Sequence, residues 1–276
     1  MFVIVNVKKS GKRKIRQGKT VDCVHEYKTS AGERFYIVDV FDSDKGVNWN
    51  ETASFIGRHS NHILIDDSIT PPIDCPVKKY NSIKFKNILL FNTVGLILKQ
   101  MYLAGCRPKC FINDDNAQYA FLLNKIVKFS AQTTVKTNKS YLYYSHISSL
   151  YTQMGVSVTI TDKAIDTDED IIVIDTNSNL NTKSKMLFSV YGNGFAPKYV
   201  DGFNNLKSIC PTYINTVDFL GAIYEFNREQ KLEDALCRVV CKDNVNFSLP
   251  ELSEKFINEK TSDNGRLFFA YNLTYN

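Results

Sequence analysis

The sequence predicts an α/β protein with a mostly parallel sheet, and three observations lead to this fold class. Between about residues 86 and 176, short apolar segments alternate with segments in which apolar residues recur every three or four positions. Strands separated by helices pair in parallel, because each helix carries the chain back across the sheet. The region before residue 45 is instead rich in β-branched residues, and helical patterns return after residue 215. We therefore expect a small antiparallel β-rich domain, then the α/β domain, then C-terminal helices.

The first part of the chain is expected to form an antiparallel sheet and one helix. Three segments have the composition of strands: Phe2–Val7, Thr20–Tyr27 and Arg34–Phe41. The polar Lys28–Glu33 contains Gly32 and suits a hairpin turn. Asn48 or Asn50 can cap a following helix, because an asparagine side chain accepts hydrogen bonds from the free N–H groups of the first turn. Ile63–Ile65 is expected to be a further short strand.

The chain is expected to divide in a proline-rich segment. Pro71, Pro72 and Pro76 exclude both a helix and an interior strand at this point. We place a β-rich N-terminal domain with one helix at residues 1–75. Residues 76–276 then form the α/β domain with a C-terminal helical extension.

Five strands and three helices are expected to alternate in the α/β domain. The expected strands are Lys86–Phe91, Lys109–Ile112, Thr133–Lys136, Val156–Thr161 and Ile171–Ile174. The expected helices are Thr93–Ala104, Ala117–Ser130 and Tyr141–Met154. The last helix carries an aromatic stripe, which we interpret as core packing: Tyr141, Tyr144, Ile147, Leu150 and Tyr151. This succession resembles Rossmann-type proteins over roughly a third of the chain, in topology rather than in motif, and the resemblance implies a Rossmann-like three-layer domain.

The segment after residue 176 is less regular. Leu187–Val190 suits a strand, and Tyr191–Ile209, with three glycines and a proline, suits an ordered loop. Helical patterns are expected at three places: after a cap at Asn215 and through Phe226, over Gln230–Cys241 and over Leu249–Glu259. Leu267–Leu273 is expected to be a final strand.

Polar side chains follow each expected strand of the α/β domain. In open α/β sheets, ligands bind at the carboxyl ends of the strands. The residues expected to contact a ligand are Asn92, Thr93, Asp114, Asn138, Asp175 and Thr176. We therefore expect a small ligand at this edge, with a nucleotide or a dinucleotide as the cofactors to consider. Helix capping is the alternative explanation for several of these residues, Asn92 and Asn138 among them.

The turn that would hold a pyrophosphate lacks the glycine-rich fingerprint. The pattern G-x-G-x-x-G has three glycines because the backbone must approach the phosphates closely. The turn expected at Asn92–Gly95 contains one glycine. The sequence therefore favours a ligand-binding protein over a dinucleotide enzyme, and it contains no recognisable catalytic apparatus.

An enzyme with a site between the two domains is one alternative. The residues to consider are Asp114, Asp175 and His59 or His62, since carboxylates and imidazoles serve as general acids and bases. At least two of them would then converge in one cleft. The reaction classes that we consider are those of an oxidoreductase and of a transferase.

A polyanion-binding or regulatory module is the other alternative. The net charge of +5 comes from one segment, because residues 8–19 contain seven lysines and arginines and no acidic residue. Cations on such a loop bind phosphates without reading a base sequence. The residues that would make this contact are Lys12, Arg13, Lys14 and Arg16. No aromatic residue is interleaved among them, so nucleic acid is not the favoured partner.

The cysteines indicate reduced thiols rather than disulfides or metal ligands. Seven is an odd number, which does not suit a disulfide framework. Two pairs have C-x-x-x-C spacing, Cys106 with Cys110 and Cys237 with Cys241. Four thiolates would suit zinc, but buried core thiols give the same pattern, and we predict no metal site.

Composition predicts a cytoplasmic protein with no membrane partner. Hydrophobic residues at 43% and charged residues at 23% are ordinary for a globular chain. No segment reaches the roughly 18 uncharged apolar residues that a membrane-spanning helix needs. The apolar start of the sequence lacks the basic region of a secretory signal.

Overall fold

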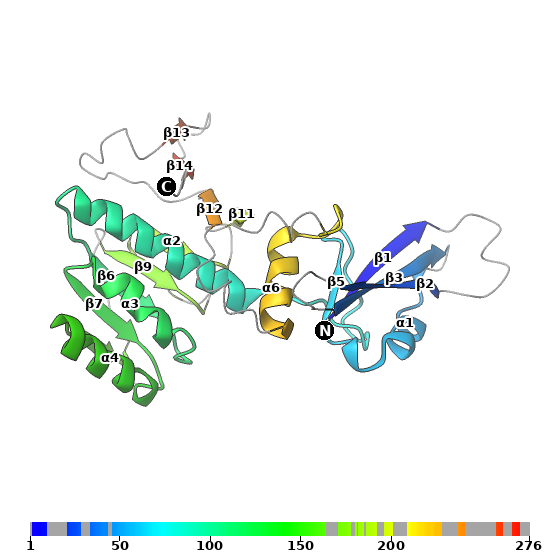
Figure 1. The fold of residues 1–276 in the computed structure, drawn as a ribbon, viewed down its shortest axis with the longest axis horizontal. Coiled ribbons are helices and arrows are strands. Elements are labelled where there is room, and N and C mark those ends of the chain that lie inside the picture. Colours follow the sequence, from blue (N-terminus) through cyan, green and yellow to red (C-terminus); the bar gives the residue numbers. More distant parts are fainter. Residues whose placement is uncertain are drawn as a thin grey trace. The chain divides into compact units, whose positions relative to one another are not determined.

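The computed structural model describes residues 2–9, 21–28, 34–43, 46–163, 171–177, 180, 182–184, 186–191, 196–200, 209–227, 237–240, 258–261 and 267–270. Contacts divide the chain into two compact units, whose elements are labelled in Figure 1. Unit 1 comprises Met1–Ser82 and Phe203–Leu232, and unit 2 comprises Ile83–Gly202 and Glu233–Asn276.

The sheet of unit 1, sheet A, is mixed rather than antiparallel. Its strands are β1 (Phe2–Lys9), β2 (Val21–Lys28), β3 (Arg34–Ser43), β4 (Gly46–Val47) and β5 (Ile63–Ile65). β2 and β3 form the expected antiparallel hairpin, but β1 is parallel to both β3 and β5. The expectation of a purely antiparallel sheet is therefore wrong. The apolar first half of β1 is buried on both faces, so β1 takes an inner position between β3 and β5 instead of pairing with its sequence neighbour β2.

Helices cover both faces of sheet A. The helix α1 (Trp49–Ile56) packs on one face, where Val3, Val5 and Val38 belong to the same buried cluster as Ile56. On the other face, the stacked rings of Phe2 and Phe35 meet Phe219 of the helix α6 (Thr216–Asn227). The core of unit 1 therefore includes a helix that lies far away in the sequence.

Two of the expected helix caps in unit 1 are confirmed. The Glu51 N–H donates to Asn48 Oδ1 at 3.2 Å, and the short 3₁₀ helix η2 (Gly57–His59) follows α1. The Val217 N–H donates to Asn215 Oδ1 at 2.9 Å. Asparagine at both positions thus satisfies an N–H group that the helix itself leaves without an acceptor.

Sheet B of unit 2 is parallel throughout and has the Rossmann strand order. Its strands are β6 (Lys109–Asn113), β7 (Gln132–Lys136), β8 (Val158–Thr161), β9 (Ile172–Asp175) and β10 (Met186–Ser189). They lie in the order β8-β7-β6-β9-β10, so the chain moves outward from β6 to β8 and then returns to the other side of β6. Read along the sheet, this is the order 3-2-1-4-5 of Rossmann-like folds. The predicted α/β class is confirmed, and each of these strands overlaps a predicted one.

Helices accompany the strands of sheet B, as expected. The 3₁₀ helix η3 (Ala120–Leu122) and the helix α3 (Leu123–Val127) follow β6 and together are shorter than the predicted Ala117–Ser130. The helix α4 (Tyr141–Met154) follows β7 with the bounds that the sequence predicts. Figure 1 shows α3 and α4 beside the strands β6 and β7.

The first expected strand of unit 2 is wrong. Lys86–Phe91 lies inside the helix α2 (Ile83–Leu103), and so do Asn92 and Gly95. Most of α2 is buried and it contacts α3, β10 and β12, so apolar residues occupy nearly all of its sides. A helix buried all round loses the one-sided pattern by which a sequence reveals it.

The aromatic stripe of α4 is also wrong as a prediction of core packing. Tyr143 and Leu150 are the buried residues of this helix, whereas Tyr141, Tyr144 and Tyr151 are exposed. Residues seven positions apart share one side of a helix, so Tyr143 and Leu150 together mark the buried side. The exposed tyrosines lie on another side.

The last part of the chain contains strands where a loop and helices were predicted. β11 (Ala196–Val200) pairs with β12 (Cys237–Val240), and β13 (Asn258–Thr261) pairs with β14 (Leu267–Ala270), both antiparallel. A strand thus replaces the end of the helix predicted at Gln230–Cys241, and another lies within the loop predicted at Tyr191–Ile209. The final strand is confirmed over Leu267–Ala270, while residues 249–257 of the last predicted helix lie outside the described residues. Among the described residues, no helix is long and apolar enough to cross a membrane.

Candidate functional site

The candidate site is the carboxyl edge of sheet B, where β6 and β9 lie side by side. From β6 the chain continues to β7 and β8 on one side, and β9 and β10 lie on the other side of β6. The order in which the chain adds strands to the sheet therefore reverses between β6 and β9, which are themselves parallel. This reversal is the topological switch point at which open α/β sheets bind ligands. The register places the ends of three strands level with one another, since Asn113 lies opposite both Lys136 and Asp175.

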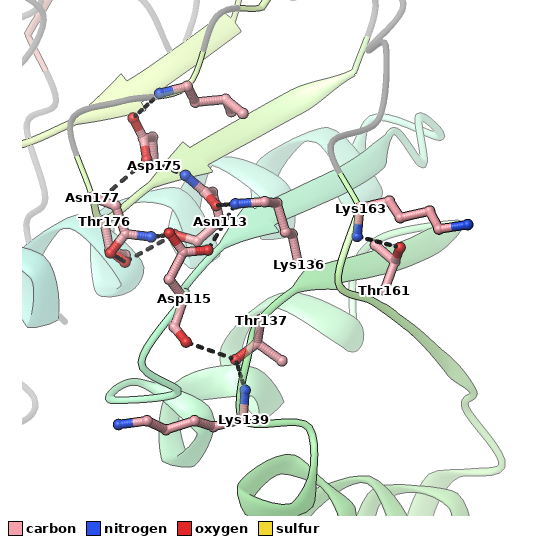
Figure 2. A network of polar contacts seen from close by, with 11 residues as sticks. Asn113, Asp115, Lys136, Thr137, Lys139, Thr161, Lys163, Asp175, Thr176 and Asn177 are labelled. Atoms are coloured by element: carbon pink, nitrogen blue, oxygen red, sulfur yellow. Dashed lines mark hydrogen bonds and ion pairs between the residues drawn. The ribbon is translucent and has the colours of Figure 1, made fainter.

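A chain of hydrogen bonds joins these three strand ends. Asn113 Nδ2 donates to Asp175 Oδ1 at 2.7 Å, and Lys136 Nζ donates to Asn113 Oδ1 at 3.1 Å. Lys136 Nζ also donates to Asp115 Oδ1 at 2.7 Å. Figure 2 shows Asn113 at the centre of this group, with Lys136 and Asp115 on one side and Asp175 on the other. We call Asn113, Asp115, Lys136 and Asp175 the edge network.

The members of the edge network differ in burial, and this difference separates their roles. Asn113 and Asp175 are buried, and the side chains of Lys136 and Asp115 retain 16% and 20% of their accessible surface. The buried Asn113 amide and Asp175 carboxylate are hydrogen-bonded to each other, and Asn113 also accepts from Lys136. These bonds fix the positions of the strand ends. The Lys136 ammonium and the Asp115 carboxylate are the more accessible groups of the edge network.

Thr176 locks the end of β9 to the end of β6. Its N–H and its hydroxyl both donate to the Asn113 carbonyl oxygen, at 3.0 and 2.8 Å. The Asn177 N–H donates to Asp175 Oδ1 at 3.0 Å. Asp175 and Thr176, both predicted as ligand contacts, therefore lie at the expected edge, with their side chains engaged in holding it together.

Asp114 lies in the loop after β6, buried and surrounded by donors. The N–H groups of Gln118 and Tyr119 donate to its carboxylate at 3.1 and 2.9 Å, and the Tyr143 hydroxyl donates at 2.8 Å. Burial outweighs these hydrogen bonds and raises the pKa of Asp114. Ala117, at the tip of the same loop, has a left-handed φ of 53°. The loop is therefore closed by its own carboxylate, in the place where a glycine-rich loop would offer its N–H groups to a phosphate.

The other predicted contacts are divided between α2 and the edge of the sheet. Asn92 and Thr93 lie within α2, so the prediction that they follow a strand is wrong. Lys125 Nζ donates to Asn92 Oδ1 at 2.6 Å, and the Thr93 hydroxyl donates to the Leu89 carbonyl at 2.8 Å. Asn138 is exposed after β7, and its N–H donates to the Asp115 carbonyl at 3.1 Å, which places it beside the edge network.

Three members of the edge network were not among the predicted contacts. Asn113, Asp115 and Lys136 depend on the register of β6 against β7 and β9, which the sequence does not reveal. The available signal was a lysine at the end of β7, after Thr-Thr-Val, and an asparagine at the end of β6 that is followed by two aspartates.

The residues of the enzyme alternative belong to different units. His59 and His62 lie in unit 1, and Asp114 and Asp175 lie in unit 2. Partial burial and the charge of Arg58 lower the pKa of His59. His62 lies against the Phe226 ring, with centroids 4.8 Å apart.

The cysteine pairs and the basic loop add no second site among the described residues. Burial raises the pKa of the Cys110 thiol to about 12, and Cys106 is exposed. Cys237 lies on β12, so the prediction of a helix that carries Cys237 and Cys241 is wrong for Cys237. The described residues contain no group of three or more residues that could hold a metal ion. The expected polyanion contacts lie outside the described residues: Lys12, Arg13, Lys14 and Arg16.

No comparison with known proteins assigns this chain to a family. No protein-family model matches the chain, and no curated protein does so either. Among solved structures, the crystal structure of L-tryptophan dehydrogenase from Nostoc punctiforme matches with 11% sequence identity and a TM-score of 0.30. The match covers 73% of this chain and 66% of that chain, which is just under two thirds of its length. The strand order of sheet B is therefore what defines the chain as a Rossmann-like α/β protein.

Proposed function

We propose that unit 2 binds a small polar ligand, of the nucleoside or nucleotide class, at the carboxyl edge of sheet B. The observation that supports this most directly is the pair Asp115–Lys136, which is partly exposed at the switch point and anchored by buried Asn113. Ligand sites combine a few well-positioned polar groups with a rigid scaffold, and this pair is held by three strands. A cytoplasmic location belongs to the same proposal, because an odd number of cysteines suits a reducing compartment.

The chemistry of the pair suits hydroxyl groups. Asp115 offers carboxylate oxygens as hydrogen-bond acceptors. The Lys136 ammonium has three donor hydrogens, and it donates to Asn113 and to Asp115 in the structure. Adjacent hydroxyl groups, such as those of a ribose, can donate to a carboxylate and accept from an ammonium at the same time. A sugar or nucleoside moiety therefore matches both members of the pair.

The loop after β6 argues against a dinucleotide. Asp114 already accepts the loop N–H groups of Gln118 and Tyr119. A pyrophosphate at this point would have to replace that carboxylate and would lie beside the negative charge of Asp115. We therefore expect nucleosides or mononucleotides to bind more tightly than dinucleotides.

The test is thermal stabilisation of the full chain by adenosine, guanosine, their monophosphates and NAD⁺. A ligand present at about ten times its Kd stabilises the folded state by about 1.4 kcal/mol, which shifts the unfolding temperature by a few degrees. Lys136→Met removes the reachable ammonium and should abolish the shift. Lys109→Met is the matched control, because Lys109 is exposed at the opposite end of β6, and it should keep the shift.

Each shift is taken against the unfolding temperature of the same variant without ligand, which separates a binding defect from a loss of stability. If none of these compounds stabilises the wild type at about 1 mM, or if Lys136→Met keeps the full shift, the proposed site is wrong.

A further inference from the structure

The helix α4 of unit 2 exposes an aromatic face in the part of the chain that the structure describes. Tyr141, Tyr144 and Tyr151 of α4 are 65%, 59% and 65% exposed, and Leu142 is 41% exposed. The three tyrosines lie at positions i, i+3 and i+10, so they share one side of the helix. We call this side, with its three tyrosines, the tyrosine face.

The helix that carries the tyrosine face has no charged residue. The sequence of α4 is YLYYSHISSLYTQM, without an aspartate, glutamate, lysine or arginine in 14 residues. Helices at a protein surface ordinarily carry charged side chains on the side that faces water. Tyrosine is enriched at protein–protein interfaces and charged residues are depleted there. The composition of α4 is therefore that of an interface rather than of a solvated surface.

The strand that follows α4 in the chain is also free of charged residues. β8, which begins three residues after Gly155 ends the helix, reads Val-Thr-Ile-Thr and pairs with β7 alone among the described residues. Exposed edge strands are ordinarily protected from pairing with other chains by lysine, proline or a bulge. The four residues of β8 contain neither lysine nor proline, and its register with β7 is regular.

We propose that the tyrosine face is the contact surface of a homodimer, with a second copy of this chain as its occupant. In a two-fold dimer each patch meets its own copy, so a charged residue near the axis would meet a like charge. A charge-free helix and a charge-free edge strand avoid this repulsion. Two copies of β8 related by such an axis would run antiparallel, which is a pairing that edge strands can form.

The lack of charge on α4 also argues against a nucleic acid or a strongly charged protein as the partner. A nucleic acid requires lysine or arginine to neutralise its phosphates, and α4 has none. A strongly acidic or basic protein would require the opposite charge on this face. A neutral face does not repel a second copy of itself.

The expected dimer is weak. A helix of 14 residues is about 21 Å long, and a stable interface usually buries about 800 Å² on each partner. One helix face with a short strand edge falls below that area, so we expect a Kd in the micromolar range. The dimer should therefore dissociate on dilution.

Sedimentation velocity of the full chain from about 1 to about 200 μM tests this proposal. The wild type should pass from monomer to dimer in this range. The double variant Tyr144→Glu/Tyr151→Glu should stay monomeric throughout. Phe55→Glu is the matched control, because Phe55 is an exposed aromatic residue of α1 in unit 1, and it should dimerise like the wild type.

The substituted side chains are exposed, so we expect all three proteins to fold. A cooperative unfolding transition, measured for each protein, checks this. A wild type that remains monomeric at the highest concentration overturns the proposal, and so does a double variant that still dimerises.

Discussion

Single residues at the carboxyl edge of sheet B hold one another in place. Asp114 shows this most clearly, because its carboxylate is buried and receives three hydrogen bonds from its own loop and from α4. The amide of an asparagine would turn N–H groups toward some of those donors. We expect Asp114→Asn to lower the free energy of unfolding by about 1–3 kcal/mol, as measured by chemical denaturation.

The same residue makes a prediction about pH. Burial raises the pKa of Asp114 in the folded protein, so the folded state keeps this proton at pH values at which the unfolded state has released it. Stability from this group is then complete below the ordinary pKa of aspartate and is lost as the pH rises through the raised pKa. The stability difference between the wild type and Asp114→Asn should therefore shrink as the pH rises above the ordinary pKa of aspartate, about 3.9.

Asp162→Asn is the control for both measurements, because Asp162 is exposed after β8. A difference between the wild type and Asp114→Asn that grows with pH over this range would contradict the expected direction of the pH dependence.

The sequence located the candidate site to within one edge of the sheet but did not identify its central residues. Asp175 and Thr176 were predicted there and lie there. Asn113 and Lys136 become neighbours through strand register, which depends on side-chain packing across the whole sheet. Asn92 and Thr93 were misplaced because a buried helix was taken for a strand and a turn.

At the scale of elements, α2 is the clearest case in which tertiary packing overrides the sequence pattern. Gly95 lies where a Cβ atom would come within 3.0 Å of the Lys125 carbonyl oxygen, so its lack of a side chain allows α2 and α3 to pack closely. The close contact between α2 and α3 cannot be inferred from the local periodicity of either helix. By contrast, α4 is buried on one side and has a left-handed Gly155 at its end, and the sequence predicts its bounds correctly.

We expect Gly95→Ala to destabilise unit 2. Overpacking against a backbone carbonyl costs about 1–3 kcal/mol, and the better helix propensity of alanine offsets about 1 kcal/mol of it. The net loss in the free energy of unfolding should be about 1 kcal/mol, measured by denaturation. Gln100→Ala, on a half-exposed side of the same helix, should change stability by less than about 0.5 kcal/mol. A Gly95→Ala protein that is more stable than the wild type would show that α3 does not approach α2 in this way.

At the scale of the whole molecule, unit 1 is built from two distant parts of the chain. Phe219 of α6 lies with its ring centroid 5.9 Å from that of Phe2 and 5.4 Å from that of Phe35. The sequence predicted α6 and its asparagine cap, but not its attachment to the first 82 residues. Helix periodicity shows that a face is buried, and it does not show which sheet buries it.

Phe219→Ala should therefore destabilise unit 1. Removing a buried phenylalanine ring costs about 3–5 kcal/mol. The chain has one tryptophan, Trp49, which packs against the core of unit 1, so tryptophan fluorescence reports the unfolding of that unit. Its midpoint in denaturant should fall markedly in Phe219→Ala and hardly at all in Phe55→Ala, where the ring is exposed. Equal midpoints for the two variants would mean that α6 is not part of this core.

The split of unit 1 also sets an order for folding during synthesis. The ribosome makes the strands of sheet A first and reaches α6 only after about 150 further residues, from the end of β5 at Ile65 to Thr216. At about 5–20 residues per second, this wait is roughly 8–30 s. During that time the Phe2 and Phe35 rings have no helix to cover them, and the nascent sheet is open to a chaperone or to misassociation. Unit 1 thus begins to fold first but cannot finish until the segment carrying α6 has emerged.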